Sequence, residues 1–207
     1  MLTGDDVIAL KEDSKMNFKL VLLVVAVISI FRAPVEAGNE SSGGGKGILC
    51  RNSLGRIVSV EVLDLFEGKH LYHLNYDGLY EKKGYLEIAD EVFSHLKKYK
   101  LGETNGLDGL IDQIHEPLRF LVGIEPAPIN DVDAIFQPPR NCEFVQIATV
   151  GMGGRPMISK SLWDRMDNVN RAALLLHEAF YSEELEFFVN RSARIRAKLA
   201  YAMAKHD

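Results

Sequence analysis

The longest apolar run of this chain lies near its start. Leu20–Phe31 reads LVLLVVAVISIF, twelve residues without a charge. A bilayer-spanning helix needs about 20 apolar residues, and the run has no polar face that would suit an amphipathic helix. Lys19 precedes it, and small residues at Val35 and Ala37 follow it. This order is typical of a secretory signal. We therefore expect residues 1–37 to be a signal peptide.

The first fifteen residues fit a signal peptide poorly, because they hold four acids and only two lysines. We expect translation to begin at Met16 instead. The next segment, residues 38–47, reads GNESSGGGKG. Its composition is typical of a flexible polar linker, and we expect no fold information from it.

Alternation of apolar and polar residues begins after this linker. Ile48–Arg51 is expected to be a strand, and Asn52–Gly55 has the composition of a turn. Val58, Val60 and Val62 then alternate with Ser59 and Glu61, a half-buried strand pattern. The two strands together predict a hairpin.

Helical spacing dominates the middle of the chain. A helix is expected to start at residues 63–67 and to end at Gly68. Apolar residues recur every three or four positions from Ile88 to Tyr99 and again from Leu107 to Ile114, where Pro117 ends the pattern. Residues 124–140 hold four prolines and predict a long extended crossing.

The last third of the chain alternates again and then returns to helical spacing. Strands are expected at Phe144–Val150 and Pro156–Ser159, joined by a glycine-rich turn. Asp167 is a suitable N-cap for a helix from Val169 to Tyr181, and Ser192 for a last helix. We therefore expect residues 48–207 to form one α+β domain. Its small antiparallel sheet would carry helices on one side, with the helix of residues 169–181 at the centre.

The amino-acid composition bears on two questions, nucleic-acid binding and disulfide formation. The chain holds 24 Lys and Arg against 29 Asp and Glu, a net charge of −5. This mild acidity argues against a nucleic-acid partner, because nucleic-acid-binding proteins usually carry a basic surface patch. Two cysteines, Cys50 and Cys142, remain in a chain expected to be exported. An even count in an oxidising compartment predicts one disulfide, and two free buried thiols are the alternative.

One helix carries the candidate site. Residues 170–181 read NRAALLLHEAFY, apolar on nearly every side, so the helix should be buried. Its polar side chains His177 and Glu178 then need partners, because a buried unpaired charge costs several kcal/mol. His177 and Tyr181 lie four residues apart and share a face.

Three interpretations of this helix remain open. In the zinc motif His-Glu-x-x-His the second ligand is a histidine, but here Tyr181 stands in its place, so His177 is only a weak metal candidate. In the structural interpretation an arginine of the last helix, Arg194 or Arg196, pairs with Glu178. In the third, the same groups line a binding pocket. The candidate site is therefore His177, Glu178, Tyr181 and Arg196, with no cofactor implied.

Several short motifs together resemble a family of exported proteins of Gram-negative bacteria that has no established activity. They are Gly43–Gly47, Cys50, Val62–Leu65 with Glu67, Cys142-Glu143, Leu176–Tyr181, and Ser192 with Arg194 and Arg196. The resemblance covers nearly the whole chain after the signal peptide. It implies export and a Cys50–Cys142 disulfide, and it names no substrate.

Two functions follow as expectations. The first is a non-enzymatic, envelope-associated binding or interaction module in the periplasm or outside the cell, with a partner there and no membrane anchor after signal cleavage. The second is a hydrolase, with or without a metal ion, in which Glu178 acts as general base and His177 as ligand or acid.

Overall fold

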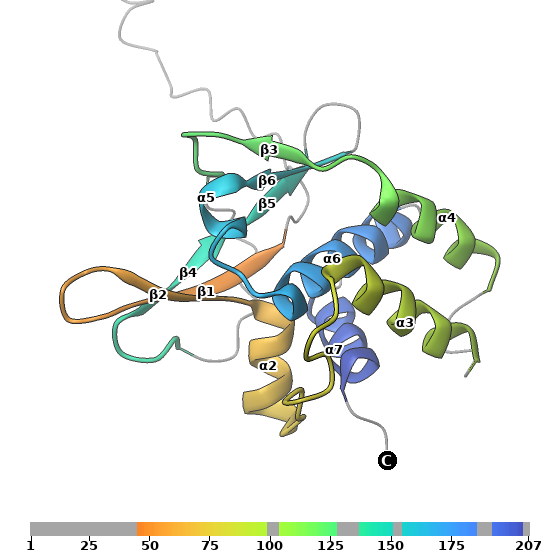
Figure 1. Cartoon of the computed structure of the whole chain (residues 1–207), viewed down its shortest axis with the longest axis horizontal. Coiled ribbons are helices and arrows are strands. Elements are labelled where there is room, and N and C mark those ends of the chain that lie inside the picture. Colours follow the sequence, from red (N-terminus) through yellow and green to blue (C-terminus); the bar gives the residue numbers. More distant parts are fainter. Residues whose placement is uncertain (1–44, 99–103, 128–136, 151–154, 186–191, 205–207) are drawn as a thin grey trace, which may run out of the picture. The chain divides into compact units, whose positions relative to one another are not determined.

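Six strands and six helices make up the part of the chain that the structure describes, which is residues 45–98, 104–127, 137–150, 155–185 and 192–204 of a computed structural model. All of them belong to one unit that spans residues 41–207 (Figure 1). The expected signal peptide, residues 1–37, lies outside the described residues, as does most of the expected linker.

The first sheet is antiparallel and has the strand order β2-β1-β4. Strand β1 spans Lys46–Arg51, β2 Ile57–Val62 and β4 Cys142–Gln146. The predicted hairpin is confirmed, since β1 and β2 pair in register from Gly47 opposite Val62. Strand β1 begins at Lys46, inside the segment that we expected to be a linker.

Both faces of this sheet carry apolar residues. Leu49, Val60 and Val62 point into the main core, and Ile48 belongs to a smaller cluster with two residues of the following helix. Val58 was expected to continue this pattern but is 61% exposed, because a bulge between the Cys50–Ser59 and Arg51–Ile57 pairs leaves it unpaired. Ile57 packs against the main core instead.

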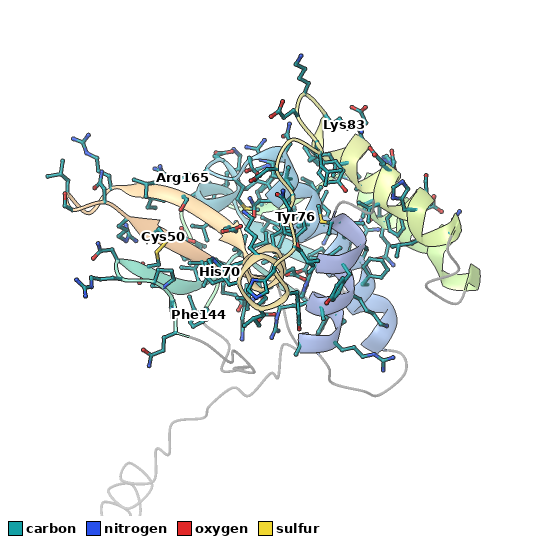
Figure 2. All side chains as sticks on the ribbon, turned by 90° about the horizontal axis from the view of Figure 1, so that it is seen from below. Cys50, His70, Tyr76, Lys83, Phe144 and Arg165 are labelled. Atoms are coloured by element: carbon teal, nitrogen blue, oxygen red, sulfur yellow. A yellow bond between two sulfur atoms is a disulfide. The ribbon has the colours of Figure 1, made fainter. Side chains whose placement is uncertain are left out.

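The predicted disulfide joins Cys50 to Cys142. The two cysteines lie directly opposite each other on β1 and β4, so the bond links neighbouring strands that are 92 residues apart in sequence. Figure 2 shows Cys50 and its sulfur bond among the strands.

The second sheet has the order β3-β6-β5 and is mixed, because β3 and β6 run parallel. Strand β3 spans Arg119–Leu121, β6 Pro156–Ser159 and β5 Ala148–Val150. Strand β3 was not predicted, since three residues are too few for alternation to be recognised. The single strand expected at residues 144–150 is two strands, and Ile147 between them is where the chain passes from one sheet to the other.

Helix α2 spans Leu63–Tyr72, so the prediction that Gly68 ends it is wrong. A Cβ atom at Gly68 would lie 1.9 Å from the Tyr76 hydroxyl and 3.0 Å from the Cβ of Ala200. Glycine is therefore needed inside the helix to let Tyr76 and the last helix approach closely. Tyr76 lies beside that helix and donates to the Ala200 carbonyl (Figure 2). The helix ends at His73, which has a left-handed backbone.

Five further helices follow α2 in the described residues. They are α3 (Tyr85–Lys98), α4 (Thr104–His115), α5 (Lys160–Trp163), α6 (Asn168–Leu185) and α7 (Ser192–Met203). Helix α6 packs against α2, α3, α4 and α7 (Figure 1). Asp167 caps its start as predicted, because its Oδ1 accepts from the Asn170 backbone N–H at 2.8 Å. The α+β class and the central position of this helix are confirmed.

No helix in the described ranges combines the length and the apolar character needed to cross a bilayer.

Candidate functional site

Three candidate side chains of α6 are buried. His177 is 3% exposed, Glu178 6% and Tyr181 4%. They are buried because the rest of the helix is apolar, and Leu174 and Leu176 beside them are fully enclosed. Each polar group therefore depends on a partner within the protein.

His177 is held by an aspartate of helix α2. Its Nδ1 lies 2.8 Å from Oδ1 of Asp64, and both side chains are almost completely buried. Burial by itself would lower the pKa of His177, but the Asp64 carboxylate outweighs this and raises it above the usual value of 6.5. The Tyr181 ring is nearly parallel to the imidazole, at 6.0 Å between centroids. Oδ2 of Asp64 is buried and has no hydrogen-bond partner among the described residues.

Arg196 of α7 pairs with a second acid of α2. Its Nε lies 2.7 Å from Oε2 of Glu67, and both side chains are buried. The prediction that such an arginine reaches Glu178 is therefore wrong in its partner: α7 packs against both α2 and α6, and Arg196 pairs with α2. Burial raises the pKa of Glu67, and the Arg196 guanidinium opposes this shift.

Glu178 accepts a hydrogen bond from the main chain instead. Its Oε1 lies 2.5 Å from the backbone nitrogen of Gly45. The Gly45 carbonyl in turn accepts from the backbone N–H groups of Ile147 and Ala148. The segment expected to carry no fold information thus contributes a buried residue to the site. Burial raises the pKa of Glu178, while His177 and the Gly45 N–H partly offset the shift.

Glu178 also lines a cavity of about 270 Å³ between α4, α6, β3 and β6. Apolar and polar side chains share the cavity wall. Its lining consists of Gln113, Ile114, Glu116, Pro117, Leu118, Arg119, Arg155, Pro156, Ile158, Leu175, Glu178 and Ala179. The other ionisable residues in this lining are exposed, and two of them pair with each other: Arg155 Nη1 lies 2.9 Å from Glu116 Oε2. Glu178 is thus the one buried ionisable residue of the lining.

The four candidate residues therefore separate into two environments. Glu178 lines the cavity, whereas His177, Tyr181 and Arg196 are absent from its lining. His177 and Arg196 instead form buried pairs with α2. Successive residues of a helix point about 100° apart, so the adjacent side chains of His177 and Glu178 contact different parts of the protein.

Sequence reasoning missed the two acids of α2. Asp64 and Glu67 lie three residues apart in LDLFEG, on one face of an otherwise apolar segment. Acids in such a segment are a recognisable signal of buried pairing, because carboxylates are rarely buried without a partner. The cavity itself had no signal in the sequence, since its walls come from four separate elements.

A zinc site was one interpretation of α6. Within the described ranges, no group of three or more His, Cys, Asp or Glu side chains is arranged to hold a metal ion. Tyr181, at the position of the missing histidine, stacks on the imidazole of His177.

Comparison of the chain with models of protein families, with curated proteins and with solved structures gives no match.

Proposed function

We propose that this protein is an exported, non-enzymatic binding protein that takes a small ligand in the cavity between α4, α6, β3 and β6. The observation that carries the proposal is a concave site with an apolar patch and one buried carboxyl group in its wall. Ligand sites in proteins combine these features: apolar walls supply affinity, and a few placed polar groups fix the ligand's orientation.

Two further properties of the cavity support binding. It is large enough for about nine water molecules, which suits a small ligand or one side chain of a larger partner. One of its walls, helix α6, is joined to α2 by the buried His177–Asp64 pair. A wall that is fixed before the ligand arrives loses little entropy on binding.

A screen of small molecules by protein-observed NMR, with the chemical shifts of the cavity residues as the readout, tests the proposal. We expect ligands to bind the wild type and a Leu54→Trp variant, which changes a side chain that is 75% exposed and lies outside the cavity lining. A Leu118→Trp variant places a larger ring in the cavity and should lose binding. Its near-UV circular dichroism should confirm that it still folds. If no ligand binds the wild type, or if ligands bind without shifting the signals of Ile158 and Leu175, the proposal is wrong.

Export is the second part of the proposal. It rests on the uncharged run at residues 20–31, on its flanking residues and on the resemblance to exported Gram-negative proteins. A disulfide is compatible with an oxidising compartment. We expect the protein, expressed in a Gram-negative host, to accumulate in the periplasm or medium with an N-terminus at Gly38. Retention of residues 20–31 in the purified protein would contradict export.

The alternative function is hydrolysis, with His177 and Glu178 acting on one substrate. In the structure only Glu178 lines the cavity, so the geometry favours binding. Metal analysis of untagged protein decides between them. Stoichiometric zinc that is lost in a His177→Ala variant would support the hydrolase, whereas a Glu178→Gln variant that changes only stability or ligand binding would support the binding protein.

A further inference from the structure

Glu178 is buried beside the cavity with an incomplete set of partners. One backbone N–H, that of Gly45, binds its Oε1. Within the described part of the chain, Glu178 forms no ion pair and Oε2 forms no hydrogen bond. Oε2 is not fully enclosed, so it is open to a bound group. The charge of His177 offsets the burial of the carboxylate only in part.

The neighbouring cations among the described residues are either engaged elsewhere or exposed. His177, the adjacent residue, is hydrogen-bonded to Asp64. Arg196 is paired with Glu67, and Arg155 at the cavity edge is paired with Glu116. Arg119 also borders the cavity, but it is exposed, and water and salt screen its charge. No cation of the described residues is thus left to pair with Glu178 directly, and a bound cation is a group that could take that place.

We infer that the cavity takes a primary ammonium group on a short apolar chain, an inference that rests on the binding function proposed above. The ammonium carries three N–H donors and a positive charge, so it satisfies Oε2 of Glu178 and balances the carboxylate. The chain lies against the apolar wall formed by Ile114, Leu118, Ile158, Leu175 and Ala179. Short n-alkylamines have this chemistry.

Three probes of equal length separate charge from shape: n-butylammonium, n-butanol and butyrate, each titrated into the full chain at constant ionic strength. Chemical-shift mapping by NMR measures binding at the cavity. We expect n-butylammonium to bind at least roughly tenfold more tightly than n-butanol, because its hydrogen bond to Glu178 is charge-assisted. Butyrate should bind most weakly, since it places a second negative charge beside Glu178.

A Glu178→Gln variant removes the charge and keeps the shape of the side chain. It should lose the preference for n-butylammonium over n-butanol and retain n-butanol binding. Glu143→Gln is the matched control, because Glu143 is an exposed acid of β4 outside the cavity lining, and it should keep the preference.

The outcomes distinguish this inference from the binding function. If n-butanol or butyrate binds the wild type at least as tightly as n-butylammonium, the ammonium specificity is wrong and the binding function stands. If the preference persists in Glu178→Gln, the role of Glu178 is wrong. If none of the probes shifts the cavity signals, and the wider screen finds no ligand either, the binding function fails as well.

Discussion

At Glu178, burial raises the pKa of the carboxyl group, whereas the hydrogen bond from the Gly45 backbone N–H lowers it. Burial raises its pKa above the ordinary value of 4.5, and the Gly45 N–H and His177 only partly offset that effect. The folded protein thus holds this proton at pH values where the unfolded chain has released it. The contribution of Glu178 to stability is largest below about pH 4.5 and falls as the pH rises toward the folded pKa.

This linkage predicts the pH dependence of a Glu178→Gln variant. Relative to the wild type, the variant should gain stability as the pH rises from about 4 to 8, because glutamine has no proton to lose; each unit of pKa shift corresponds to about 1.4 kcal/mol. Urea denaturation at a series of pH values measures the difference. Parallel stability curves for the two proteins would contradict the raised pKa.

Gly45 makes a second prediction at the residue scale. A Cβ atom there would lie 2.2 Å from Cδ1 of Leu174 and 3.0 Å from Oε1 of Glu178. Gly45→Ala should therefore destabilise the fold by about 1–3 kcal/mol, the usual cost of overpacking. Thermal or urea denaturation measures it.

Gly109 is the matched control for Gly45. It lies inside α4, is exposed, and a Cβ atom there would have no neighbour within 4 Å. Gly109→Ala should stabilise the protein by about 0.5–1 kcal/mol, because alanine favours the helix. If both substitutions change stability by the same amount, the close contact at Gly45 is not important.

At the scale of elements, α2 is joined to its neighbours by buried polar pairs. Asp64 connects it to α6 through His177, and Glu67 connects it to α7 through Arg196. Apolar packing alone permits helices to slide, whereas a buried hydrogen bond is satisfied only in one register. We interpret the two pairs as the contacts that set the position of α2.

Loss of one partner from the Glu67–Arg196 pair should be costly. Arg196→Met keeps much of the apolar volume but leaves Glu67 buried without its guanidinium, and it should destabilise the fold by about 3–5 kcal/mol. Arg194→Met on the exposed side of the same helix should change stability by no more than about 0.5 kcal/mol. Equal effects of the two substitutions in urea denaturation would show that the buried pair contributes nothing specific.

At the scale of the whole molecule, the disulfide connects the two halves of the first sheet. Cys50 belongs to the N-terminal hairpin, and Cys142 begins β4, which the chain reaches only after three helices and β3. In the chain-entropy account, such a link stabilises the fold by limiting the unfolded chain, with a magnitude that grows slowly with the length of the loop.

Reduction of this bond should lower the free energy of unfolding by about 2–5 kcal/mol. Guanidinium denaturation with and without a reductant measures the change. A variant with both cysteines replaced by alanine should show the lower stability and no response to the reductant. If the reductant leaves the wild type unchanged, the disulfide does not stabilise the folded state.

The predictions from sequence succeeded where the evidence is local. Helical spacing located α3 and α6, alternation located β1 and β2, and Asp167 was recognised as a cap because it lies next to the helix it caps. They failed at Gly68 and at β3. In both places contacts with distant residues outweigh local propensity: Tyr76 and Ala200 at the glycine, and β6 at the short strand.

The sequence by itself therefore determined the α+β class, the pairing of the two cysteines and the burial of His177 and Glu178. Each of these follows from periodicity, from the cysteine count or from the apolar residues around a polar one. Only the tertiary structure decided that His177 pairs with Asp64, Arg196 with Glu67 and Glu178 with Gly45. Those partners are more than 100 residues apart, and packing of the elements, not spacing along the chain, brings their polar atoms within hydrogen-bonding distance.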